Sequence, residues 1–356
     1  MAEASGPARS STGFRLLLGL AAAVVALAGI RAVADIAGPA FLALTLTIAV
    51  SPLRVWLRRR GARPWVLVAV PLLTVLLLLV ALVGSLVVSA AQLVALLPTY
   101  AAQYQRLLAS IARGIDHLGI TQEQVNSALS KLDPGALIGL VQGFLGGLLS
   151  IGSALILIAL LLFGMSLDAT VTHDAIRSLR ASRPHMVEAL SEFARGTCSY
   201  LIVSTVFGLI VAVLDAAALW IMGVPLPLLW GLLAFITNYI PNIGFVIGVI
   251  PPALLALLDS GPSTMVAVVV VYSVLNFVIQ SVIQPKFVGE SAGLSTTVTI
   301  LSLLVWAYEL GALGAILAVP LSAFARALLI DSDPAARWTT PLISGRLPGR
   351  PGRTPG

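Results

Sequence analysis

Amide side chains recur inside the most hydrophobic part of this chain, where a polar group needs either a partner or a function. Asn238 and Asn242 lie around a proline in one apolar run, and the next run carries Asn276, Gln280 and Gln284. Residues three and four positions apart share one face of a helix, so the last three form a stripe. Because amides donate and accept hydrogen bonds, the stripe suits a polyhydroxylated solute. Hydrogen bonding between helices is the alternative interpretation.

Two carboxylates interrupt the apolar runs, Asp215 and Glu309. An ionised group inside a bilayer costs at least ~2.5–3.5 kcal/mol, so such residues usually face a cavity, pair, or bind a proton or cation. Glu309 lies at a break in its run, where exposed helix ends can hold an ion, and we predict that it couples transport to an ion. Asp215 is the second candidate, although its place near the end of a span also allows it to reach the interface.

Catalytic chemistry finds little support in the sequence. The three histidines, His117, His173 and His185, all lie outside the apolar runs, and the single Cys198 has no cluster of metal ligands around it. The glycines after residue 136 lack the Gly-Lys-Ser/Thr ending of a phosphate-binding loop. We therefore expect no enzyme, no metal site and no cofactor.

The elements that must position the polar residues are two broken apolar runs. Pro241 and Gly244 interrupt the first, and Gly311 and Gly314 interrupt the second. Each half has roughly 13–16 residues, fewer than the ~20 that a spanning helix needs. Opened backbone at membrane depth persists only where protein buries it or where it lines a wet cavity. Paired broken segments of this kind indicate the binding site of a transporter.

Composition sets the protein class. The 356 residues are 58% hydrophobic and only 10% charged, whereas about a quarter of a soluble domain is charged. The mean hydropathy is +1.02. The net charge of +6 comes from arginines beside apolar runs, which is typical of cytoplasmic loops and not of a nucleic-acid-binding protein. We predict an all-α polytopic membrane protein that binds no nucleic acid.

Charge and hydropathy divide the chain into seven parts. They are a disordered N-terminus (1–13), three spans (14–91), an extracellular amphipathic helical insert (92–135), a fourth span (136–167), a cytoplasmic helical linker (168–198), a transport core (199–330) and a disordered cytoplasmic tail (331–356). Both termini are expected in the cytoplasm. Six or eight spans remain open, depending on whether the broken runs cross fully or dip in and return as re-entrant hairpins; Asp259 and Lys286 favour the hairpins.

A family resemblance supports this interpretation. The ordered pieces are Gly223–Pro225, Asn238–Gly244, Gln284–Gly289 and Gly311–Pro320. In their order and spacing the chain resembles the autoinducer-2 exporter (PerM-like) family from about residue 16 to 329. The resemblance implies a homo-oligomer, a pentamer in known structures, and a family that includes exporters of autoinducer-2 and sodium–proton antiporters.

We therefore predict a secondary transporter in the bacterial cell membrane that exports a small polar organic solute such as a quorum signal. A cation–proton antiporter and a scaffold without transport are the alternatives. If the two breaks are paired gates, Asn238, Asn242 and Glu309 are expected to meet near the membrane midplane, with Asn276 and Gln280 as a wall between them.

Overall fold

The computed structural model describes residues 12–100, 154–168, 178–241, 243–284 and 295–333, with a few single positions between 102 and 176. Every element in these residues is a helix. Five of the described helices are long and apolar enough to cross a membrane: Ala34–Arg59, Pro64–Tyr100, Pro184–Ile221, Pro262–Ile283 and Thr296–Ile316. The predicted all-α polytopic membrane protein is confirmed.

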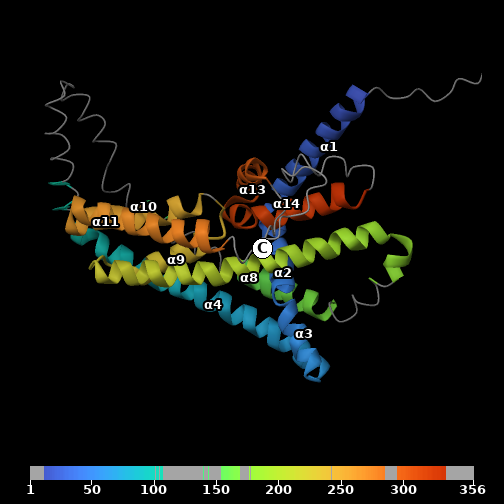
Figure 1. The fold of residues 1–356 in the computed structure, drawn as a ribbon, viewed down its shortest axis with the longest axis horizontal. Coiled ribbons are helices and arrows are strands. Elements are labelled where there is room, and N and C mark those ends of the chain that lie inside the picture. Colours follow the sequence, from blue (N-terminus) through green and yellow to red (C-terminus); the bar gives the residue numbers. More distant parts are fainter. Residues whose placement is uncertain are drawn as a thin grey trace, which may run out of the picture.

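Helix α8 (Pro184–Ile221) is the longest described helix, and the other elements are arranged along it. It begins with a proline, which is well suited to the first position of a helix because its fixed φ is already helical. Its 38 residues extend over ~57 Å, so one helix contains both the second half of the predicted linker and the start of the predicted transport core. Figure 1 shows α9, α10 and α11 beside one half of α8 and α13 and α14 beside the other.

The first broken run is a helical hairpin. Helix α9 (Pro227–Thr237) is followed by a turn and by α10 (Gly244–Ser260). A Cβ atom on Gly248 would lie 3.7 Å from the Cα of Ala234, although these residues would be ~21 Å apart along a continuous helix. The chain therefore reverses, and α10 returns to the Ile221 end of α8. Helix α11 (Pro262–Asn276) starts there, and a π-helix, η2 (Phe277–Ile283), continues it.

The second broken run reverses as well. Helix α13 (Thr296–Ile316) contains Gly311 with φ 64° and ψ −143°, a backbone conformation that only glycine adopts readily. Trp306 Nε1 donates to Ser322 Oγ at 2.8 Å, yet sixteen positions along a continuous helix would separate these residues by ~24 Å. Both breaks are therefore hairpins, which is one of the two arrangements that the sequence left open.

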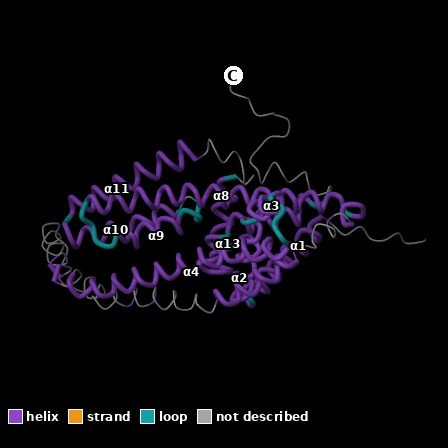
Figure 2. The backbone as a smooth tube through the Cα atoms, turned by 90° about the horizontal axis from the view of Figure 1, so that it is seen from below, coloured by secondary structure: helices purple, strands orange, loops and turns teal. Residues whose placement is uncertain are grey.

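The second hairpin packs near the start of α8. After α13 come α14 (Ala318–Arg326) and a second π-helix, η3 (Ala327–Asp331). Ala189 and Phe193 of α8 share a core cluster with Ala327. The two hairpins therefore lie on opposite halves of α8, and both tube and ribbon views show this separation (Figure 2).

The N-terminal helices surround the second hairpin and then cross the molecule. Helices α1 (Thr12–Ala32), α2 (Ala34–Ala49) and α3 (Ser51–Arg59) follow one another with single residues between them. Helix α4 (Pro64–Leu96) then leads into a short 3₁₀ helix, η1 (Leu97–Tyr100). Its last residue reaches the Ile221 end of α8, where the hydroxyl of Tyr100 donates to Asp259 Oδ1 at 2.7 Å.

Helix α4 continues beyond the predicted third span into the first residues of the predicted insert. The rest of the insert lies almost entirely outside the described residues, as do the first half of the predicted fourth span, the N-terminus up to residue 11 and the tail from residue 334. The described part of the fourth span is an apolar helix, Ala154–Asp168.

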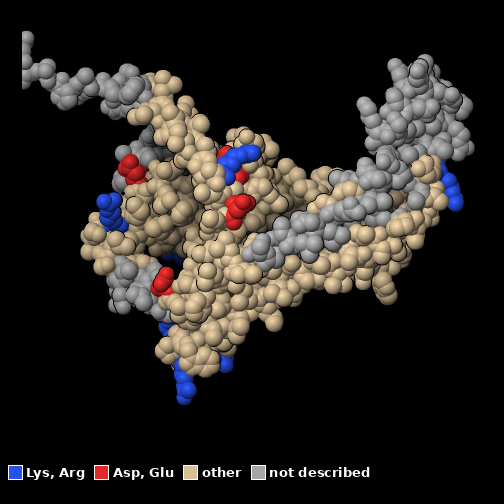
Figure 3. Space-filling model, turned by 180° about the vertical axis from the view of Figure 1, so that it is seen from behind, with Lys and Arg blue, Asp and Glu red and all other residues tan. Residues whose placement is uncertain are grey.

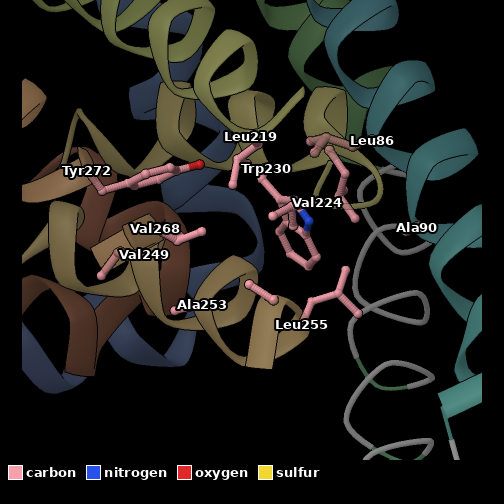
Figure 4. Close-up of a cluster of buried hydrophobic side chains, with 12 residues drawn as sticks. Leu86, Ala90, Leu219, Val224, Trp230, Val249, Ala253, Leu255, Val268 and Tyr272 are labelled. Atoms are coloured by element: carbon pink, nitrogen blue, oxygen red, sulfur yellow. The ribbon is translucent and has the colours of Figure 1, made fainter. Parts of the chain in front are cut away.

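The largest described core cluster lies where the first hairpin meets α8 and α11. Figure 4 shows Trp230 beside Leu219 and Val224, with Val268 and Tyr272 of α11 nearby. The indole Nε1 of Trp230 donates to the carbonyl of Pro225 at 3.0 Å, which satisfies its only donor. The face of the molecule in Figure 3 is largely uncharged, as expected of a surface in contact with lipid tails.

Candidate transport site

A small polar cavity lies between the first hairpin, α8 and α11. The polar side chains that line it are Asp215, Thr237, Asn238, Tyr272, Asn276 and Gln280. Its volume of about 10 Å³ is close to the ~10–15 Å³ that a single water molecule needs. A water molecule or a small cation therefore fits into this cavity, and an organic solute requires the surrounding helices to move.

Helix α8 holds the first break in place through hydrogen bonds. Asn238 Nδ2 donates to the carbonyl of Ser204 at 3.0 Å, and the hydroxyl of Tyr200 donates to the carbonyl of Tyr239 at 3.0 Å. The hydroxyls of Thr205 and Tyr239 are 2.6 Å apart. These bonds satisfy polar groups that the break would otherwise expose, which is the condition for opened backbone at membrane depth.

Glycines allow the close approaches around this break. A Cβ atom on Gly244 would overlap the carbonyl oxygen of Thr237, so the turn closes only with glycine there. A Cβ atom on Gly208 would lie 2.9 Å from Asn238 Nδ2, so a larger residue there would displace the Asn238 side chain. Pro241 lies inside the turn, and its carbonyl accepts a hydrogen bond from the amide of Ile243 at 2.7 Å.

Three amides form a network across the cavity. Gln280 Nε2 donates to Asn238 Oδ1 at 3.1 Å and to Asn276 Oδ1 at 2.9 Å. Asn276 Nδ2 donates in turn to the carbonyl of Tyr272 at 2.9 Å. The network thus joins the turn of the first hairpin to the end of α11, and a movement of either element changes the cavity.

A change of helix type separates the amides of the predicted stripe. Asn276 ends α11, and Gln280 lies within the π-helix η2. The wider turn of a π-helix rotates the residues that follow it away from an α-helical stripe. Gln284 comes after η2 and does not line the cavity, although ordinary helical spacing places it on the same face.

Asp215 is the most deeply buried acid of the described residues. It is 0% exposed, and neither carboxylate oxygen has a hydrogen-bond partner. The Asn276 side chain lies beside this carboxyl, but its amide donates to the backbone of α11 instead. The hydroxyl of Tyr272, 1% exposed and also without a partner, is close enough to interact with the Asp215 charge.

The second break has a different surrounding. Glu309 is 8% exposed, and its Oε2 has no hydrogen-bond partner, but it does not line the cavity. The guanidinium of Arg31 in α1 donates to the carbonyl of Tyr308 at 3.1 Å and stacks over its ring at 3.9 Å. Gly314 closes this turn as Gly244 closes the first, since a Cβ atom there would overlap the carbonyl oxygen of Trp306.

The structure therefore brings together four of the predicted site residues, Asn238, Asn276, Gln280 and Asp215, around one cavity. Gln284 and Glu309 lie outside its lining, and Asn242 lies outside the described residues. A coupling role for Glu309 stays a prediction.

Sequence reasoning missed the polar groups that complete the site. Thr237 and Tyr272 line the cavity, and Tyr200, Ser204 and Thr205 hold the break from α8. These residues lie within apolar runs. Their only signal is that Tyr200, Ser204 and Thr205 place three hydroxyl groups within six residues of α8, and this does not identify the segment that they contact.

The arrangement can bind a hydrogen-bonding solute or hold a cation. Amide and hydroxyl groups suit a neutral polar molecule. The described residues contain no group of three His, Cys, Asp or Glu side chains suited to a metal. A cation in this cavity would therefore be held by a single carboxylate, Asp215, together with neutral oxygens. Buried carboxylates without partners inside a membrane protein typically bind protons or cations or face a substrate path.

Comparisons with known proteins match the chain to transporters. Residues 20–332 match the family described as AI-2E family transporter. The YhhT protein of Escherichia coli (strain K12), named for transport without a stated substrate, is 32% identical over 352 residues, which cover 98% of this chain and 99% of YhhT.

A second relative has a named substrate. The AI-2 transport protein TqsA of Escherichia coli (strain K12) is 30% identical over 317 residues, 89% of this chain and 92% of TqsA. A transport protein of Haemophilus influenzae, likewise without a stated substrate, is 27% identical over 329 residues. The residues that match the family, 20–332, include both hairpins and all elements that line the cavity.

Proposed function

The chain belongs to the AI-2E family of transporters, and from this premise we propose that it exports a small, polar, largely uncharged organic solute across the bacterial cell membrane. Its site is the cavity at the turn of the first hairpin. The similarity to the AI-2 transport protein TqsA supports a solute of the autoinducer-2 type. No catalytic step and no cofactor enters this function.

The observation that carries the proposal is the amide network. Gln280 bridges Asn238 on the hairpin turn and Asn276 on α11, so a solute that replaces these bonds would separate the two elements. A site built from hydrogen-bonding groups favours ligands that satisfy them, because unpaired polar groups are costly once water is excluded. A hydroxyl-rich solute satisfies amides without bringing a charge into the membrane.

Cation–proton antiport is the second candidate function, and Asp215 is the specific observation in its favour. The carboxyl is fully buried without hydrogen-bond partners, and the cavity beside it accommodates a particle of the size of water. Such a group can alternate between a proton and a cation. The same carboxyl would also serve solute export if the export is driven by an ion gradient.

We further propose a homo-oligomer, a pentamer by family resemblance, with both termini and the arginine-rich residues 51–64 in the cytoplasm. Five arginines and no acid occur in that segment, and arginine-rich loops stay on the cytoplasmic side. Labelling of a single cysteine at position 60, in a Cys198→Ala background, tests the orientation. Reaction with an impermeant reagent outside intact cells would contradict it.

Uptake into everted vesicles tests the transport function. Vesicles that contain the wild type are expected to accumulate a labelled autoinducer-2-type solute, and Gln280→Leu is expected to lower uptake about 10-fold at low solute concentration. Loss of hydrogen bonds worth ~0.6–2 kcal/mol each accounts for an effect of this size. Gln284→Leu is the matched control, because this residue lies outside the cavity, and it is expected to transport like the wild type.

Parallel assays separate the alternatives. Sodium flux that depends on a proton gradient, without movement of the organic solute, would favour antiport. Absence of both fluxes in vesicles that contain folded protein would favour a scaffold and overturn the transport proposal for this chain.

A further inference from the structure

A buried arginine near the start of the chain has no counter-charge among the described residues. Arg54 lies on α3 and is 7% exposed, and its Nε and Nη2 have no hydrogen-bond partner. A guanidinium stays protonated in proteins, so burial cannot be relieved by loss of the proton. A buried charge without a partner is costly, and such groups are normally paired. Within the part of the chain that the structure describes, these N–H groups therefore lack an acceptor.

The nearest charge increases the need of the Arg54 guanidinium for an anionic partner. Arg58 is one helical turn away and acts on Arg54 as a like charge, and among the described residues neither arginine forms an ion pair. An anion between the two guanidinium groups would reverse this repulsion. Arginine binds phosphate through two parallel N–H···O bonds, a geometry that lysine lacks. A phosphate group is thus the ligand that this pair fits best.

The position of α3 identifies the source of the phosphate. Trp56 on α3 and Trp65 at the start of α4 have exposed fractions of 49% and 65%, and tryptophan is enriched where lipid headgroups meet the hydrocarbon. Arg60 stacks over the Trp56 ring at 4.3 Å, so this part of α3 is itself ordered. The charged tip that projects in Figure 3 lies where Figure 1 places α3.

Exposed apolar side chains occur along α4, the helix that follows α3. The exposed fractions of Leu73, Leu77 and Leu78 on α4 are 61%, 76% and 50%. A phospholipid whose phosphate lay at Arg54 and Arg58 would have exposed apolar helix surface available for its acyl chains. Free phosphate would make no use of this surface.

We propose that Arg54 and Arg58 of α3 form a binding site for the phosphate of an anionic phospholipid. The site is fixed to the transport scaffold, because the junction of α2 and α3 packs on α8, where Cys198 Sγ lies 3.9 Å from the carbonyl oxygen of Ala49. The exposed arginines of the same helix interact with the membrane surface through charge alone. Arg54 differs from them because its unpaired N–H groups are buried.

Thermal unfolding of the full-length protein in nanodiscs tests the proposal. Wild-type protein is expected to unfold at a higher temperature in discs that contain phosphatidylglycerol than in discs of phosphatidylcholine alone. Arg54→Gln is expected to lose at least half of this shift. Arg59→Gln removes the same charge from an exposed position on another face of α3, and it is expected to keep the shift.

Two further arms make the result decisive. Arg58→Gln changes an exposed residue, so folding is expected to be unaffected, and the variant is also expected to reduce the shift. It therefore tests the site even if Arg54→Gln does not yield folded protein. Inorganic phosphate added to phosphatidylcholine discs is expected to leave the unfolding temperature unchanged. Equal shifts in all variants, or stabilisation by inorganic phosphate equal to that by phosphatidylglycerol, would overturn the proposal.

Discussion

The two breaks share a backbone design but differ in their chemistry. Each turn ends at a glycine, Gly244 or Gly314, where a Cβ atom would overlap a carbonyl oxygen of the preceding helix. Around the first turn lie amides, hydroxyls and the fully buried Asp215. Around the second lie the buried acid Glu309, whose Oε2 has no hydrogen-bond partner among the described residues, and Arg31, which donates to the backbone carbonyl of Tyr308. The same fold element thus supports a site in one place and mainly a structural contact in the other.

This difference shows that a broken helix creates the opportunity for a site but does not define it. The polar cavity depends on what α8 and α11 present to the turn, because the described residues of the break contribute only Thr237 and Asn238 to its polar lining. At the second break, α1 occupies the corresponding place and contributes a cation. The predictions below test the shared backbone first and the differing chemistry afterwards.

The largest effect is expected from alanine at the closing glycines. Gly244→Ala and Gly314→Ala place a methyl group on a carbonyl oxygen, so each hairpin must open, with a cost at or above the ~1–3 kcal/mol of ordinary overpacking. We expect little folded protein by size-exclusion chromatography after mild detergent extraction. Gly84→Ala in α4 meets no atom within 4 Å and serves as the control. Normal yields of both variants would mean that the turns are wider than described.

A smaller effect of opposite sign is expected at Asp215. Asp215→Asn removes an ionisable group without partners from a buried site, where the charge costs ~2.5–3.5 kcal/mol, and it is therefore expected to raise the unfolding temperature at neutral pH. Asp35→Asn makes the same change at an exposed position of α2 and is expected to be neutral. A lower unfolding temperature for Asp215→Asn would show that the carboxylate has stabilising partners.

A more moderate loss of stability is expected from a change in the backbone of the second break. At Gly311 there is space for a methyl group, but φ is 64°, so Gly311→Ala is expected to destabilise the protein by ~1–3 kcal/mol through backbone strain alone. Thermal unfolding measures the loss, with Gly164→Ala as the control at an open helical position. An unchanged unfolding temperature would argue against this left-handed conformation.

The smallest effect is expected at the end of the first hairpin. Tyr100→Phe removes the hydrogen bond to Asp259 and is expected to cost ~0.5–1.5 kcal/mol. Tyr308→Phe, on a ring that is 69% exposed, keeps the stacking of Arg31 and is expected to be neutral. If both variants unfold alike, the contact between α4 and this hairpin contributes no stability.

The sequence was sufficient to predict the helical membrane fold, the positions of both breaks and three of the amides that line the cavity, Asn238, Asn276 and Gln280. These features follow from hydropathy, from proline and glycine within apolar runs and from helical spacing. The partners of the breaks were not predictable, since the contacts of Ser204 with Asn238 and of Arg31 with Tyr308 join residues far apart in the chain. The π-helix η2 also has no sequence signal, and it separates Gln284 from the other amides.

Side-by-side transport assays of Asp215→Asn and Glu309→Gln test the central claim, that the first break holds the transport site. The measured quantity is uptake of a labelled autoinducer-2-type solute into everted vesicles with and without an imposed proton gradient. The account predicts that Asp215→Asn abolishes the stimulation by the gradient and that Glu309→Gln retains most of it. Loss of stimulation in Glu309→Gln together with wild-type behaviour of Asp215→Asn would contradict the account and place the coupling at the second break.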